Sequence, residues 1–147
     1  MSYIKKELKT QKQDLVSSFN NICLNMANYI ASKFPKSQIG MHISLIRTFI
    51  DCKPSEVIAR FIQLVYSVDI YRQSIKNKDE NFFLNHTYDE LKGHKWSDDN
   101  MFEFKDLWFR LEDESKELIK ESMLLLVEHT EKYITILAEL NKLKKKE

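Results

Sequence analysis

The chain has 147 residues, of which 43% are hydrophobic and 31% are charged, and its formal net charge is +1. This length suits one domain with a sizeable core, over residues 1–147, and this composition excludes a disordered chain. The small net charge argues against a dedicated nucleic-acid-binding protein.

The first predicted element is a helix of about thirty residues. Between residues 3 and 33, apolar side chains recur every three or four positions, and no glycine or proline interrupts them. This spacing is typical of an amphipathic helix, which would be about 45 Å long. We expect it to end at Phe34, because Pro35 disfavours the α conformation in the residue before it.

Two more helices are predicted in the middle of the chain. Ser37 can cap a helix that runs to about Asp51, although residues 39–45 alternate as they would in a strand. We favour a buried helix, because the chain offers no second strand to pair with this segment. The next helix has Pro54 in its first turn and is apolar on more than half of its circumference, which is typical of a helix in the middle of a bundle.

Residues 77–100 are predicted to be irregular. Within them, residues 79–84 can form one turn of helix, and Thr87-x-x-Glu90 is a capping box for another that Gly93 would close. After Ser97 no glycine or proline follows, and the weakest point of the helical pattern is LEDES at 111–115. Either one long helix spans this region or two helices meet at a kink there; we favour one long helix that is bent or broken near Glu112–Ser115. The sequence therefore predicts an all-α fold, a helical bundle of three to five helices with a long N-terminal and a long C-terminal helix.

The segment MFEFKDLWFRL at positions 101–111 carries more apolar surface than one helix face needs. The stripe through Trp108 belongs in a core, whereas Phe102 and Phe109 lie on another flank. This second flank can be buried beneath residues 77–100. Alternatively, it contacts another chain, because Trp, Phe and Met are favoured at interface cores.

The last predicted helix offers a second candidate interface. A helix of about fifty residues would reach roughly 75 Å, so part of its apolar seam would lack a partner unless the helix folds back. An unpaired seam of that size normally pairs with another subunit. We therefore predict a protein partner or self-association, with the candidate interface residues Phe102, Trp108, Phe109, Leu126, Tyr133 and Leu140.

Lysines gather at both ends of the chain. Residues 1–12 have a net charge of +3, and the C-terminal NKLKKKE is also basic, whereas residues 98–121 contain nine acids and four bases. A nucleic-acid-associated accessory protein is the alternative function, although the basic ends lack stacking side chains apart from Tyr3. The N-terminal lysines would then contact phosphate together with Lys142, Lys144, Lys145 and Lys146.

The sequence lacks the spacings that usually mark enzymes and metal sites. It has no glycine-rich phosphate loop, no H-E-x-x-H and no E-x-x-H, and its two cysteines fit neither a zinc motif nor a disulfide framework. We expect no cofactor, no metal and no enzymatic activity; an enzyme would need a site assembled from residues distant in sequence. The histidines are interpreted as surface or capping residues: His42, His86, His94 and His129.

Residue usage indicates an origin and a compartment. Nineteen lysines against four arginines, with many Ile and Asn, are typical of an AT-rich genome, such as that of a large DNA virus. The chain has neither a membrane-spanning run nor the apolar core of a secretory signal. We expect a protein that is not secreted and that serves in a reducing intracellular compartment or a virion, as a structural or scaffolding subunit of a larger assembly.

Overall fold

The computed structural model describes residues 2–86 and 98–146, and the side chains of the second range from residue 103 onward. The secondary structure in these ranges is entirely helical, so the fold is all-α. Eight α-helices and one π-helical segment are described there, instead of three to five helices, because the predicted long helices are interrupted. They are α1 Tyr3–Lys33, α2 Gln38–Met41, α3 Ile43–Cys52, α4 Pro54–Phe61, η1 Ile62–Tyr66, α5 Asp69–Lys76, α6 Glu80–Asn85, α7 Asp98–Arg110 and α8 Asp113–Lys145.

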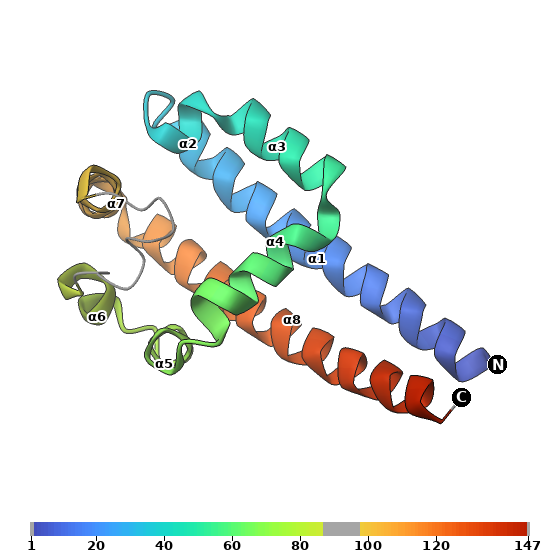
Figure 1. Cartoon of the computed structure of the whole chain (residues 1–147). Helices are drawn as coiled ribbons and strands as arrows, with labels where there is room; N and C mark the ends of the chain where they lie inside the picture. The colour runs from blue at the N-terminus through green and yellow to red at the C-terminus, as the bar shows by residue number, and fades with distance from the viewer. Residues whose placement is uncertain (1, 87–97, 147) are drawn as a thin grey trace.

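Helices α1 and α8 form an antiparallel pair, so both termini lie at the same end of the molecule (Figure 1). The side-chain oxygen of Ser2 caps α1 by accepting a hydrogen bond from the Lys5 amide at 3.3 Å. The helix ends before Phe34, where the sequence predicts its end. Near that end, the hydroxyl of Tyr29 is hydrogen-bonded to Ser115 at the start of α8.

The predicted long C-terminal helix is two helices. Helix α7 ends at Arg110, and Glu112 is extended (φ −72°, ψ 158°) before α8 begins. With 31 and 33 residues, α1 and α8 are about 46 and 50 Å long. Their lengths match, so the expected mismatch between a 75 Å helix and the N-terminal helix was wrong.

The two middle helices of the prediction are also interrupted. Ser37 caps α2 as predicted, since its hydroxyl oxygen accepts a hydrogen bond from the Gly40 amide at 3.0 Å. The chain then breaks at His42, which separates α2 from α3. After α4, the π-helical segment η1 and the extended Val68 separate α4 from α5.

The core lies where α4 crosses the α1–α8 pair. The rings of Phe19 and Phe61 pack edge to face with 5.3 Å between their centroids. The side-chain amide of Asn20 joins α1 to α4 by donating to the Pro54 carbonyl at 2.9 Å. The buried cluster consists of Val16, Phe19, Ile58, Leu126 and Tyr133.

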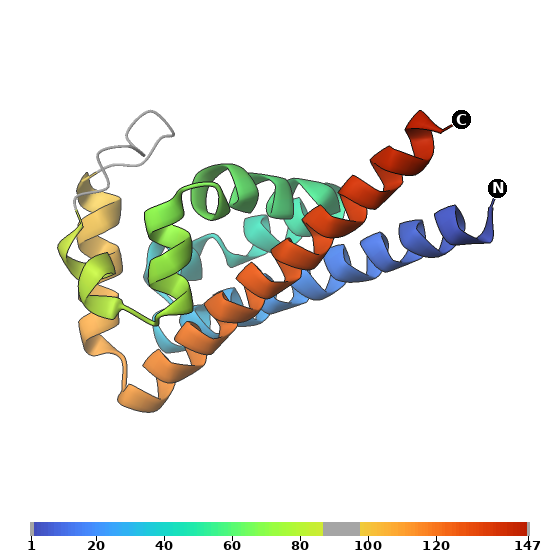
Figure 2. The ribbon, with the colours of Figure 1, turned by 90° about the horizontal axis from the view of Figure 1, so that it is seen from below.

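The shorter helices cover only part of the α1–α8 pair, and the terminal turns of both long helices project beyond them (Figure 2). We call these turns, residues 2–12 and 136–146, the arm. The side of α8 that is buried at Leu126 and Tyr133 continues one turn further to Leu137, which is 37% exposed. On α1, Ile4 is 61% exposed. Apolar positions of both helices therefore lose their cover in the arm.

Candidate functional site

The aromatic segment of α7 is split between core and surface. Trp108 is buried, with 8% of its surface exposed, whereas Phe109 is 68% exposed. Phe102 lies outside the described side chains. Of the predicted core stripe through Trp108, Leu111 is buried as well, whereas Phe104 is 39% exposed.

An apolar cavity of about 140 Å³ lies beneath α6 and α7, against Phe83, Trp108 and Met123. Lys78 and Lys120 also line it. The Lys78 ammonium is hydrogen-bonded to Glu121, which raises the lysine pKa. Partial burial lowers the pKa of Lys120, but its pairing with glutamates outweighs that effect and raises it. Carboxylates therefore pair with both lysines at the cavity.

The predicted interface residues of α8 lie at different depths. Leu126 and Tyr133 are buried in the core, where burial raises the pKa of the Tyr133 hydroxyl. Leu140 is half-buried on the arm. Among the candidate interface residues with described side chains, Phe109 and Leu140 can be reached by another chain without a change in the fold.

The antiparallel pairing brings the two basic ends of the chain together. The lysines of the first three turns of α1 lie at the same end of the molecule as those of the last turns of α8 (Figure 1). The arm contains eight lysines and two glutamates, so its net charge is +6. Lys142 forms an ion pair with Glu139 at 3.9 Å. The other candidate phosphate contacts, Lys144, Lys145 and Lys146, are exposed.

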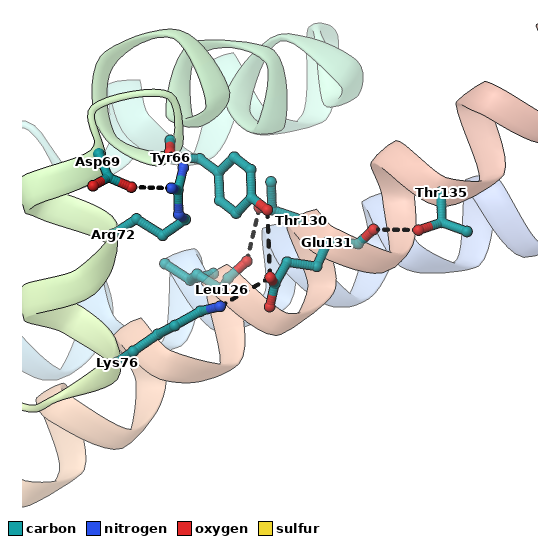
Figure 3. Close-up of polar contacts among 8 residues, drawn as sticks. All are labelled: Tyr66, Asp69, Arg72, Lys76, Leu126, Thr130, Glu131 and Thr135. Carbon is teal, nitrogen blue, oxygen red and sulfur yellow. Dashed lines mark hydrogen bonds and ion pairs between the residues drawn. The ribbon is translucent and has the colours of Figure 1, made fainter.

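A polar cluster fastens η1 and α5 to α8 (Figure 3). The hydroxyl of Tyr66 and the ammonium of Lys76 both donate to Glu131 Oε2, at 3.4 and 3.0 Å. Arg72 is paired with Asp69, and it donates to the Tyr66 carbonyl oxygen at 2.9 Å. π-Helical segments are common at functional sites. Here, however, each charge has a partner, so the cluster serves to hold the helices together.

The histidines and cysteines with described positions do not converge. Nδ1 of His42 and of His129 lies 2.9 and 2.8 Å from the carbonyl oxygen four residues earlier, so both rings are engaged locally. Cys23 is half-buried, and this burial raises its pKa to about 12, whereas Cys52 is exposed. His94 lies outside the described residues. Within the described part of the chain, no cluster of His, Cys, Asp and Glu could hold a metal ion.

Helices α2 and α3 present an apolar face that the sequence patterns did not single out. Met41, Leu45 and Phe49 are 60%, 66% and 39% exposed and follow one another at intervals of four residues. We call these three residues the α2–α3 stripe. Ile50, on another side of the same helix, is buried. The alternation at residues 39–45 spans the break at His42, so it does not reflect the periodicity of a single helix and gave no signal for this face.

No family model, no curated protein and no solved structure matches this chain. Among the described helices, none is long and apolar enough to cross a membrane. Function is therefore inferred from the fold and from the surfaces that it leaves uncovered.

Proposed function

We propose that this chain is a non-enzymatic helical interaction protein, a small subunit or scaffold of a larger protein assembly. The observation that carries the proposal is the α2–α3 stripe. A single exposed leucine is common on protein surfaces. Here three large apolar side chains are exposed close together in the chain, Met41 at the end of α2 and Leu45 and Phe49 one turn apart on α3, and such a group is typical of surfaces that bind other proteins.

The stripe is held on a fixed support, which favours binding. Ile50 anchors α3 from its buried side, and Arg47 Nη2 donates to Asn28 Oδ1 of α1 at 3.1 Å. A surface that is already ordered loses less conformational entropy when a partner binds. The stripe therefore resembles a preformed docking face more than a flexible segment.

Phe109 and Leu140 remain candidate contacts in this proposal, because both can be reached from outside. Trp108, Leu126 and Tyr133 would support the surface from within the core. The exposed thiol of Cys52 suits a reducing compartment. A virion component of a large DNA virus is one such subunit, in keeping with the codon usage that the composition indicates.

The proposal is tested by measuring the mass of the complexes that contain this chain in an extract of the cells that express it. We expect the wild-type chain to run in complexes heavier than the purified chain. Leu45→Glu places a charge on the stripe and should return the chain to the mass of the purified protein. Ser44→Glu adds the same charge to an exposed neighbour on a different side of α3 and should leave the complexes intact.

Two results would overturn the proposal. One is a wild-type chain that keeps the mass of the purified protein in the extract. The other is a Leu45→Glu variant that enters the complexes as fully as the wild type does. Thermal melting of both variants shows whether the fold is retained.

A further inference from the structure

The arm combines uncovered apolar side chains with strong positive charge. Ile4 and Leu137 are 61% and 37% exposed, and Leu140 is half-buried. They are interspersed with eight lysines against two glutamates. A partner for this surface needs apolar side chains of its own together with negative charge.

Two arms are poor partners for each other. A symmetric dimer through the arms would bring one net charge of +6 against another, and juxtaposed like charges are unfavourable at an interface. The arm therefore favours a different, acidic surface.

The opposite end of α8 carries such a surface. Glu114, Leu118, Glu121 and Leu125 are spaced by four, three and four residues, so they lie on one face of the helix. Leu118 is 50% exposed and Leu125 is 42% exposed. Residues 112–121 contain five acids and two lysines, for a net charge of −3, and this sum is unchanged when the ion-pair partners Lys78 (of Glu121) and Glu80 (of Lys120) are included. We call Glu114, Leu118, Glu121 and Leu125 the acidic stripe.

The two surfaces also match in length. The acidic stripe spans residues 114–125, and the C-terminal part of the arm spans residues 136–146. At 1.5 Å per helical residue, each is about 16 Å long. We propose that the arm of one copy of this chain packs on the acidic stripe of a second copy. This proposal rests on the proposed function as an assembly subunit, and it names a second copy of the chain as one partner.

The contact is head-to-tail, because arm and stripe occupy different ends of α8. After one contact has formed, each of the two copies still has one of its surfaces free. Further copies can then add, so the assembly is a closed ring or a filament. The ionic part of the contact is solvent-exposed, so association weakens as the salt concentration rises.

Nucleic acid is the competing occupant of the arm. Phosphate would pair with the lysines, but it would leave Ile4, Leu137 and Leu140 without apolar contacts. Arginine, which stacks on bases as well as pairing with phosphate, is absent from residues 2–12 and 136–146. These features favour the protein surface.

The test uses two variants of the full chain, each with one surface removed. Both sets of substitutions fall on exposed positions, so the fold is retained, and melting curves verify this. The arm variant carries Lys6→Gln, Lys9→Gln, Lys144→Gln and Lys145→Gln. The stripe variant carries Glu114→Gln, Leu118→Gln and Leu125→Gln. A control for each removes similar side chains elsewhere: Lys36→Gln with Lys53→Gln, and Asp51→Asn with Ile70→Gln.

Light scattering measures the mass of each protein in solution, after nuclease treatment, at low and at high salt. We expect the wild type and both controls to exceed the monomer mass of 17.6 kDa, increasingly so at higher concentration. Each variant alone should stay at the monomer mass. Mixed together, the intact stripe of one and the intact arm of the other should give a dimer of twice that mass, which cannot extend.

Four results would overturn the head-to-tail contact. They are a monomeric wild type at all concentrations, variants that associate as the wild type does, a mixture that stays monomeric, and association that disappears on nuclease treatment. The last result would assign the arm to nucleic acid. The proposed function stands or falls separately, because its test depends on Leu45 and on complexes in the extract.

Discussion

At the scale of single residues, the fold depends on a few fully buried side chains. Ile58 has no exposed surface and contacts the central cluster, whereas Ile70 is 51% exposed. Ile58→Ala should lower the free energy of unfolding by about 2–5 kcal/mol, through lost burial and the cavity left behind. Ile70→Ala should change it by about 0.5 kcal/mol or less. Chemical denaturation measures both changes in the free energy of unfolding. Equal changes for the two variants would show that the core does not lie around Ile58.

The two cysteines should differ sharply in reactivity. Burial raises the pKa of Cys23 to about 12, so its thiol stays protonated in the folded protein, whereas Cys52 is exposed. Only thiolates react with common thiol reagents. At mildly alkaline pH we expect the native chain to consume one equivalent quickly, and the second only after denaturation. Cys52→Ser should abolish the fast phase; a fast phase that persists would place Cys23 at the surface.

The same burial gives stability a pH dependence. The Cys23 thiol ionises near its ordinary pKa of 9.0 when the chain is unfolded, but only near about 12 when it is folded. The unfolded state therefore loses its proton first, and the stabilising effect declines as pH rises from about 9 towards about 12. Unfolding free energies measured across this range should fall less steeply for Cys23→Ala. If the unfolding free energies of the wild type and of Cys23→Ala fell equally with pH, the ionisation of Cys23 would not be the cause of the pH dependence.

At the scale of helices, the junction of α1 and α2 depends on Gly40. A Cβ atom there would lie 2.5 Å from the Phe34 carbonyl oxygen and 2.6 Å from that of Pro35. Gly→Ala in a helix ordinarily stabilises by about 1 kcal/mol. Here a clash with backbone atoms, of about 1–3 kcal/mol, should outweigh that gain.

Thermal melting can check the sign of this effect. We expect Gly40→Ala to melt below the wild type, and Ser44→Ala, at an exposed helical position of α3, to melt at or above it. A Gly40→Ala variant that melts at a higher temperature would show that the α1–α2 junction relaxes without cost.

Helix ends were predictable from sequence only where a local signal marks them. Pro35 ends α1 and Ser37 begins α2, and both effects act within one turn. The break between α7 and α8 falls at residues 111–112, within the predicted weak point at 111–115. No local signal marks the break at His42 or the π-helical segment η1. The latter is held by Tyr66 and its contact with Glu131, which lies 65 residues away in the chain.

The candidate site was predictable to a similar extent. Leu126 and Tyr133 were expected to contact another chain, but both are buried in the core cluster, because periodicity does not say that α1 and α4 cover them. Periodicity also cannot show that Leu45 faces outward, because both sides of α3 are apolar. Whether a residue is exposed depends on which helices pack against its own helix. One amphipathic pattern is compatible with several such packing arrangements.

At the scale of the whole molecule, stability should vary along the α1–α8 pair. Its middle is buried under α4, whereas in the arm the ends of α1 and α8 project beyond the other described helices (Figure 2). Amides with few buried neighbours open more easily. We expect hydrogen exchange to be faster near Ile4 and Leu140 than near Phe19 and Leu126. Uniform protection along both helices would mean that the arm is covered in solution.

The shared position of the two termini has a practical consequence. A purification tag or a fused fluorescent protein, at either end, would be attached directly to the arm and would crowd its lysines (Figure 1). Moving the tag from one terminus to the other would not relieve this crowding, so a tagged chain tests the association under the least favourable conditions. Cys52 is exposed and lies outside the arm. A dye coupled to its thiol would report on this protein while leaving both ends free.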